Sequence, residues 1–338
     1  MDLYRPYEKS PGLISHTLDF LRSMDILLCR SYVRLAPERA SLIVVGLHSL
    51  LRDQAQSEQQ TIDPRMGFTV DQLRCLIEYF MECGYTFISP DDMERGLDIH
   101  RKYLLLTFDD GYYNNNLALP VLKQYQIPAT FFISTDYVLH NRSFWWDVVY
   151  REMSKQRKTL QDIDRLCRQL KRYPVKVIDL FVRKAFGSRA FEPIGDLDRP
   201  FLSDELIEFS RSPLVSIGNH TAHHAILSVC SSQEIKQEIQ GAQEALANLT
   251  GIVPKIIAYP NGNTSQEIMN ECRTLGLTFG VTDKGYKNHL PLDGQSVRSL
   301  QLGRFVLTQY QSELRHFETL RSDIQPKKQF KALLCRKG

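Results

Sequence analysis

YLLLTFDDG (Tyr103–Gly111) is an apolar run that ends abruptly in two aspartates and a glycine. A short apolar run that stops at a turn signal predicts a buried strand, here over 103–108. Active sites of parallel α/β folds gather at the carboxyl ends of their strands. We therefore expect this strand to deliver Asp109 and Asp110 to such an edge, where one carboxylate can bind a metal ion while its neighbour faces a substrate.

Similar apolar runs recur along the chain and alternate with helix-like segments. SLIVVGL over 41–47 has the β-branched continuity of a strand buried on both faces. Capping boxes after Thr69 and Ser231 begin two amphipathic helices, which glycines end. This sustained alternation predicts parallel α/β architecture, either a barrel or a doubly wound sheet. Further strands are predicted over Ala129–Ser134, Leu214–Gly218, Lys255–Tyr259, Leu277–Thr282 and Arg304–Leu307.

Three other parts of the chain lack strand signals. Residues 148–199 are helical and basic, which indicates a helical insertion in the α/β body of 41–310. It forms either a lid or wall of a binding cleft, or a solvated helical excursion. Residues 1–40 are predicted to be an N-terminal helical extension. Residues 311–338 are predicted to be a C-terminal helix followed by a basic tail.

The amino-acid composition limits the binding partners and the cellular compartment that we expect for the protein. The 338 residues include 42 Lys and Arg against 39 Asp and Glu, a net charge of +3, which is too small to favour nucleic acid or an anionic membrane as the main partner. No apolar run is long enough for a transmembrane helix, and the N-terminus does not resemble a secretion signal. Seven scattered cysteines without a Cys-x-x-Cys pair indicate reduced thiols. We therefore expect a cytoplasmic protein; nothing in the sequence specifies its oligomeric state.

A histidine cluster follows the strand predicted at 214–218. His220 and His224 are four residues apart, so on one helical turn their rings would face the same way. Neutral imidazoles in that arrangement suit zinc, cobalt, nickel or iron. His223 points off that face, and we expect it behind the site or on the surface.

Together, the two segments predict metal-assisted hydrolysis. One aspartate and two histidines supply three ligands and leave coordination positions open, which is typical of catalytic metal sites. The second aspartate supplies a base for a water molecule.

Three motifs give the chain a family resemblance. TFDDG at 107–111, HTAHH at 220–224 and AYPNG at 258–262 resemble the first three signature motifs of the polysaccharide deacetylases, the NodB-homology domains of carbohydrate esterase family four. PATFFIS at 128–134 also matches the family in place. The resemblance covers about 42–307, and it implies a distorted (β/α) barrel of about seven strands.

The resemblance also implies a reaction and a set of roles. The reaction is hydrolysis of the N-acetyl group of an amino sugar, in a polysaccharide, a glycolipid or a glycan precursor. One divalent metal ion is implied, zinc with cobalt or nickel as alternatives. Asp109 matches the base, and the backbone N–H of Asn261 matches an oxyanion donor. The metal ligands match Asp110, His220 and His224, and the groove wall matches Tyr259, Pro260 and Asn261.

The sequence departs from the family pattern in two places. The third motif usually begins with an arginine that pairs with the base, and Ala258 stands there instead. Arg304 either supplies that charge from the last strand or is an ordinary strand-end arginine. The family's acid is the histidine of a Leu-x-His motif, whose nearest match, ending in His316, lies in a helix-like run. His48, after the 41–47 strand, is better placed, and the identity of the acid stays open.

Phe144-Trp145-Trp146-Asp147 contains both tryptophans of the chain. Trp146 either stacks on a sugar from the cleft wall or belongs to the core. Asp147 could contact the metal or the sugar. Two other functions remain open at this point: a metal amidohydrolase of small non-sugar amides, and a glycan-binding relative that has lost catalysis.

Overall fold

A computed structural model describes residues 13–309 and 314–324, with side chains from residue 24 onward. The predicted basic tail over 326–338 falls outside the described residues. The strands are β1 Ser41–Leu47, β2 Ser49–Leu51, β3 Gly67–Thr69, β4 Tyr85–Phe87, β5 Lys102–Phe108, β6 Ala129–Ile133, β7 Val215–Asn219, β8 Ile256–Ala258, β9 Phe279–Val281, β10 Asn288–His289 and β11 Phe305–Val306. The helices are α1 Leu13–Leu35, α2 Val70–Glu82, α3 Pro90–Arg95, α4 Ala118–Tyr125, α5 Thr135–His140, α6 Trp145–Lys155, α7 Leu160–Leu170, α8 Val175–Phe186, α9 Ser203–Ser210, α10 Ser232–Thr250, α11 Gln266–Thr274 and α12 Leu314–Arg321.

The main sheet is nearly all parallel and curls back on itself. Its strands follow the order β10-β1-β5-β6-β7-β8-β9, and β11 pairs with β1 while β4 pairs with β5. Only β10 runs antiparallel to its neighbour. A bridge from Val281 at the end of β9 to Leu302, three residues before β11, brings the last strand back toward β1. The expected distorted (β/α) barrel is therefore confirmed.

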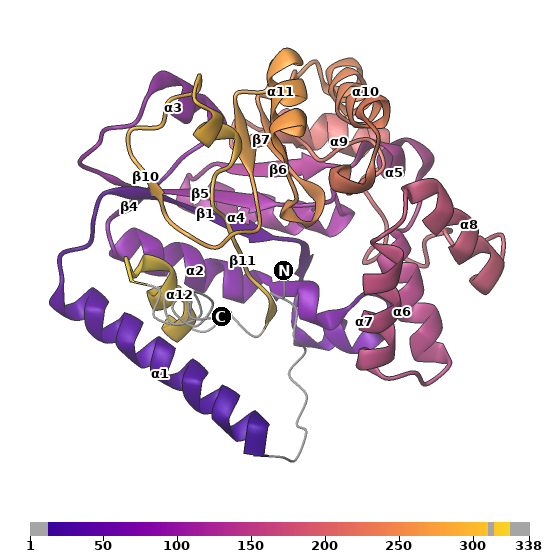
Figure 1. Cartoon of the computed structure of the whole chain (residues 1–338), viewed down its shortest axis with the longest axis horizontal. Helices are drawn as coiled ribbons and strands as arrows, with labels where there is room; N and C mark the ends of the chain where they lie inside the picture. Colours follow the sequence, from indigo (N-terminus) through magenta and orange to yellow (C-terminus); the bar gives the residue numbers. More distant parts are fainter. Residues whose placement is uncertain (1–12, 310–313, 325–338) are drawn as a thin grey trace, which may run out of the picture.

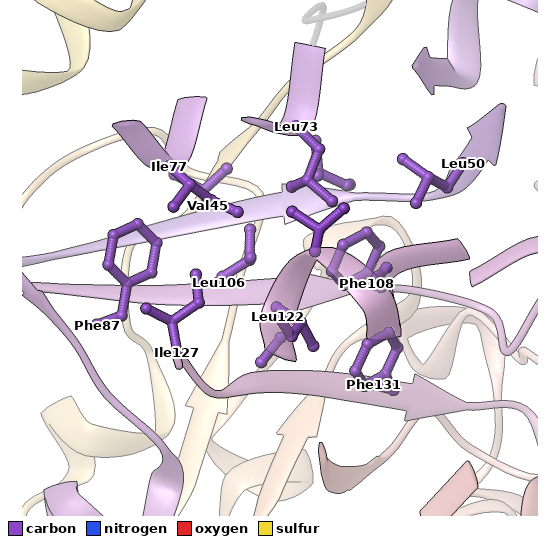
Figure 2. Packing of buried hydrophobic residues seen from close by; sticks show 14 of the residues in the cluster. Val45, Leu50, Leu73, Ile77, Phe87, Leu106, Phe108, Leu122, Ile127 and Phe131 are labelled. Atoms are coloured by element: carbon purple, nitrogen blue, oxygen red, sulfur yellow. The ribbon is translucent and has the colours of Figure 1, made fainter. Parts of the chain in front are cut away.

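The largest apolar core lies between the first strands and the helices that follow them. Figure 2 shows Val45 of β1, Leu106 of β5 and Phe131 of β6 packed with Leu73 of α2 and with Leu122 of α4. Phe108 and Phe131 stack with ring centroids 4.8 Å apart. Asp109 and Asp110 thus follow a strand, β5, whose apolar side chains are buried.

The predicted strands appear where the apolar runs lie. β1 spans the predicted 41–47, and β5 starts one residue before the predicted 103. Both capping boxes are present, after Thr69 and Ser231, and each starts the helix it predicted. The residues from 148 to 199 form helices and turns only.

Helices α6, α7 and α8, which we call the three-helix segment, lie together at one side of the sheet (Figure 1). They surround a separate apolar cluster whose buried members all lie between Trp145 and Phe191. Two ion pairs tie the segment to the rest of the molecule. Arg65, before β3, contacts Asp164 of α7 at 2.7 Å, and Arg142, after α5, contacts Asp179 of α8 at 2.5 Å.

The linker from α1 to β1 carries a partly buried acid, Glu38, whose side chain is 7% exposed. Its carboxylate accepts hydrogen bonds from Tyr85 at the start of β4 and from Lys102 of β5. Arg321 at the end of α12 donates to it at 2.9 Å, and Lys287 lies 3.5 Å away. This cluster ties the linker before β1 and the end of α12 to strands β4 and β5. Over residues 13–309 and 314–324, no helix has the length and apolarity needed to cross a membrane.

Candidate active site

The carboxyl ends of the parallel strands bring the motif residues together. Asp109 and Asp110 directly follow β5, and His220 directly follows β7. The ring of His220 reaches the next strand, where its Nδ1 lies 2.8 Å from the carbonyl oxygen of Ala258 in β8. Three distant parts of the sequence thus meet at one edge of the sheet.

Asp110, His220 and His224 form a group that could hold a metal ion. One ligand atom from each residue lies within 4.8 Å of the other two. Oδ1 of Asp110 is 3.4 Å from Nε2 of His220 and 3.3 Å from Nε2 of His224. The two imidazole rings are 4.7 Å apart between centroids.

The chemistry of these donors fits a divalent ion. Oδ1 of Asp110 is buried and accepts no hydrogen bond, which is costly for a carboxylate oxygen unless a cation faces it. The contact of His220 Nδ1 with a carbonyl oxygen requires a proton on Nδ1, which leaves the lone pair of Nε2 free for a metal. Burial lowers the pKa of His224 to about 3, so that ring is neutral; for His220, the neighbouring Asp109 and Asp110 outweigh burial and raise the pKa. Nitrogen and carboxylate donors in this combination suit zinc, cobalt or nickel.

The turns that aim these side chains use left-handed backbone. Asp110 has φ of 76°, a conformation that aspartate tolerates better than most residues. Thr221 and His224 also have positive φ, so the expectation that His220 and His224 share a helical turn is wrong. The backbone is held instead by local hydrogen bonds, because Asn219 Oδ1 accepts from the N–H of Thr221. The two rings meet through this turn rather than through helical periodicity.

Asp109 sits beside the histidine pair and is gripped by Arg304. The guanidinium donates from Nη1 to Oδ1 at 2.6 Å and from Nη2 to Oδ2 at 2.8 Å, and Nη2 also donates to Asp283 at 2.8 Å. Burial by itself would raise the pKa of Asp109, but Arg304 and His220 outweigh it and hold the pKa below its usual range. The carboxylate is therefore ionised and fixed in orientation.

Arg304 reaches Asp109 by lying across β1. A Cβ added at Gly46 would come within 3.2 Å of the Arg304 side chain, so the absence of a side chain there gives the arginine its path. The pairing that the third motif lacks at Ala258 is thus made from the residue before β11. Of the two interpretations of Arg304, the structure supports the first, because its charge lies on the carboxylate of Asp109.

The two histidines considered as the acid lie in different surroundings. Nε2 of His48 is 3.9 Å from Oδ2 of Asp109, which puts His48 next to that carboxylate. His316 lies on α12, which packs against α1 and α2. It contributes no atom to the group formed by Asp110 and the histidine pair.

Some residues of the AYPNG segment are buried in the core, and Asn261 is exposed at the surface. Tyr259 is fully buried and donates its hydroxyl to the carbonyl of Leu300 at 3.0 Å, so its ring belongs to the core rather than to a cleft wall. Pro260 is buried too, while Asn261 is exposed with φ of 60°. Gly262 also has positive φ, and a Cβ there would lie 2.4 Å from the backbone nitrogen of Asp283. The loop that presents Asn261 is therefore packed against the residue that binds Arg304.

Trp146 borders the cluster of Asp110 and the two histidines, whereas Asp147 lies apart from it. The partly exposed ring of Trp146 lies 4.5 Å from the ring of His224, so it borders the site. Its Nε1 donates to the hydroxyl of Tyr112 at 2.9 Å, and that hydroxyl donates to Asp147 at 2.6 Å. Asp147 is buried behind these aromatic rings and is not among the grouped ligand atoms.

His223 turns away from the other two histidines. Its Nδ1 contacts Glu238 of α10 at 2.9 Å and its Nε2 contacts Asp136 of α5 at 3.4 Å. Hydrogen bonds with Asp136 and Glu238 raise its pKa to about 10. It is therefore a charged bridge between two helices, as its position off the ligand face suggested.

Sequence reasoning missed two charged residues of this region, Asp283, which accepts from Arg304, and Lys171. Lys171, the residue after α7, donates from Nζ to Oδ1 of Asn261 at 2.8 Å. A lone lysine in a run rich in Lys and Arg carries no local signal. Its proximity to the site becomes visible only in the fold, which brings the end of α7 next to the AYPNG loop.

Comparisons with known proteins agree with the fold. The family model described as polysaccharide deacetylase matches residues 97–280, more than half of the chain. A search of curated proteins gives no match.

Several solved structures resemble the fold. A polysaccharide deacetylase from Bacillus cereus is 18% identical with a TM-score of 0.57, over 84% of this chain and 70% of that one. IcaB from Ammonifex degensii is 17% identical with a TM-score of 0.56, over 84% and 98%. A de-N-acetylase from Aggregatibacter actinomycetemcomitans is 16% identical with a TM-score of 0.57, over 82% and 99%. At these identities the likeness concerns the fold.

Proposed function

The chain belongs to the polysaccharide deacetylase family, hydrolases that act on carbon–nitrogen bonds, and from this premise we propose that it removes N-acetyl groups from an amino sugar with the help of one divalent metal ion. The observation that carries the proposal is the buried Oδ1 of Asp110, which accepts no hydrogen bond and faces Nε2 of both His220 and His224. The substrate class is a polysaccharide, a glycolipid or a glycan precursor, and the metal is zinc, with cobalt or nickel as alternatives.

Each residue has a separate task in this proposal. Asp110, His220 and His224 hold the ion. When bound, it polarises the acetyl carbonyl and lowers the pKa of water. Asp109, which Arg304 holds ionised, takes a proton from the attacking water. The exposed Asn261 offers its backbone N–H to the developing oxyanion, and Trp146 supports the sugar beside His224.

Acetate release after metal removal tests the proposal. Protein stripped with a chelator should lose activity on N-acetylhexosamine oligomers and recover it with zinc, cobalt or nickel. Activity that survives complete metal removal would overturn metal dependence. The same assay with a panel of small non-sugar amides separates an amidohydrolase from a sugar deacetylase. Protein that binds metal and sugar but never releases acetate would be a glycan-binding relative.

Ligand variants supply the matched control. His220→Ala should lose bound metal in elemental analysis, because two donors alone bind a divalent ion poorly. His223→Gln removes a histidine from the same segment that makes no contact with Asp110, and it should keep the metal. Equal metal content in the two variants would reject the assigned ligand set.

A further inference from the structure

The three-helix segment places a cation at the edge of the proposed site. Lys171 is half-buried, and its Nζ donates to the side chain of Asn261 at 2.8 Å. Asn261 lies three residues after Ala258, whose carbonyl accepts from His220. The ammonium is also close enough to shift the pKa of His224 downward, as a smaller effect behind burial and the neighbouring Asp110 and His220.

Contacts on both sides of Lys171 hold it in this position. Earlier in α7, Asp164 pairs with Arg65 through both terminal guanidinium nitrogens, Nη1 and Nη2, at 3.0 and 2.7 Å. Beyond Pro174, Asp179 of α8 pairs with Arg142. The turn that carries Lys171 is thus fixed between two ion pairs rather than extending into solvent.

Amide hydrolysis needs a proton donor as well as a base, since an amine leaves poorly as an anion. His48 sits against the base Asp109, where water is activated. His316 lies on α12 against α1 and α2. Lys171 instead contacts Asn261, the residue whose backbone N–H would meet the oxyanion.

We propose that Lys171 is the proton donor to the leaving amine, an inference that rests on the proposed deacetylation. When the carbon–nitrogen bond breaks, its electron pair goes to nitrogen, and an N–H bond of the Lys171 ammonium supplies the proton. The acetyl carbon keeps the hydroxyl from water, and the proton taken by Asp109 passes to solvent. Lys171 is then reprotonated from solvent, so the sum is amide plus water to amine plus acetic acid.

The electrostatics of Lys171 agree with this role. Burial lowers the pKa of its ammonium, with nearby groups including Asp283 and Asp110 acting in the opposite direction. An ammonium whose pKa moves down toward the working pH gives up its proton more readily than an exposed lysine.

Substrates with different leaving groups test the proposal. In metal-loaded protein, Lys171→Gln should lower acetate release from an N-acetylhexosamine oligomer by about 10²–10⁴-fold, the usual contribution of a positioned acid or base. On 4-nitrophenyl acetate, whose phenolate leaves without a proton, the same variant should stay close to the wild-type rate. Asp109→Asn should lose activity on both substrates.

Two further variants distinguish proton transfer from charge or structure. Lys171→Arg keeps the cation but releases a proton poorly, so it should remain as impaired as Lys171→Gln. Arg172→Gln removes the neighbouring exposed cation and should behave as wild type. The wild-type rate should fall at high pH as Lys171 deprotonates, and this fall should be absent from the residual activity of Lys171→Gln.

Each outcome decides the inference. Full activity of Lys171→Gln on the sugar amide, or rescue by arginine, would overturn the role of Lys171 while leaving the proposed function intact. Equal losses on the amide and the ester would show a structural effect instead. A metal-loaded wild-type protein that releases no acetate from any acetamide would overturn both proposals together.

Discussion

At the scale of single residues, the buried carboxylate of Asp109 has its charge and direction set by Arg304. We expect Asp109→Asn to retain its metal and its fold but to release acetate about 10²–10⁴-fold more slowly, because an amide cannot accept the proton from water. Steady-state rates measured alongside metal content check this. An Asn variant that holds metal and works at the wild-type rate would remove Asp109 from the mechanism.

Asp147 differs from Asp109 in that its pKa is raised rather than lowered. Burial raises its pKa well above the usual value, so the folded protein binds that proton more tightly than the unfolded chain. Stability is then lost as the pH rises above about 4, the unfolded value. Asp147→Asn keeps an acceptor for Tyr112 and removes this loss. In urea unfolding it should be at least as stable as wild type at pH 7 and should converge with it below about pH 4; a less stable variant at pH 7 would show that Asp147 is charged.

The three candidate metal ligands could be predicted from the sequence, whereas some of the residues around them could not. Asp110, His220 and His224 stand in short segments whose residue types and spacing are sufficient to predict a metal site. The route by which the rings meet could not be predicted, because positive φ at Thr221 and His224 has no clear sequence mark. Lys171 was missed because its importance arises only from packing between distant segments.

At the scale of elements, the linker between α1 and β1 makes stability depend on pH through Glu38. Burial alone would raise the pKa of Glu38, but Tyr85, Arg321 and Lys287 outweigh it and lower the pKa. A depressed pKa adds stability above the unfolded value of about 4.3, and this stability is lost as the pH falls through the folded value. Glu38→Gln should cost about 3 kcal/mol at pH 7, as expected for a broken buried ion pair.

Urea unfolding of wild type and Glu38→Gln between pH 3 and 7 measures this effect. The gap between the two proteins should narrow below about pH 4, where the wild-type carboxylate is protonated. Glu244→Gln, an exposed change on α10, should leave the free energy of unfolding nearly unaltered. A gap that stays constant with pH would mean that the charge of Glu38 contributes nothing.

The loop after β8 offers a test of close packing. Gly262→Ala forces a Cβ against the backbone nitrogen of Asp283, at 2.4 Å, in addition to the strain of positive φ. Gly251→Ala, at a helix end with open space around it, carries the strain alone, about 1 kcal/mol. The thermal midpoint of Gly262→Ala should therefore fall further, with acetate release falling too because Asn261 and Asp283 shift. Equal midpoints for the two variants would contradict the packing described.

Long strands could be predicted from the sequence, whereas the shortest strands and the closure of the sheet could not. β1 and β5 are long apolar runs, and their bounds could be predicted within one residue. β2 and β3 span three residues each and pair only with one another, so no periodicity marks them. The bridge that returns β9 toward β11 depends on the curl of the whole sheet, which no local pattern encodes.

At the scale of the whole molecule, the three-helix segment has a core of its own. Because its buried apolar residues all lie between Trp145 and Phe191, we expect it to open before the sheet does. In native-state hydrogen exchange with low denaturant, amides of α7 and α8 should exchange with a smaller opening free energy than those of β1 and β5. Exchange of both groups only through global unfolding would show a single cooperative unit.

The partnership of Asp109 with Arg304 also has a consequence for biosynthesis. The two residues are 195 positions apart, so the carboxylate leaves the ribosome long before its guanidinium is made. A nascent or truncated chain that ends before Arg304 would have to bury that charge without its guanidinium partner, at a cost of about 3–5 kcal/mol. Chains that end anywhere before Arg304 should therefore be degraded by proteases. Activity should appear only after β11 has been synthesised.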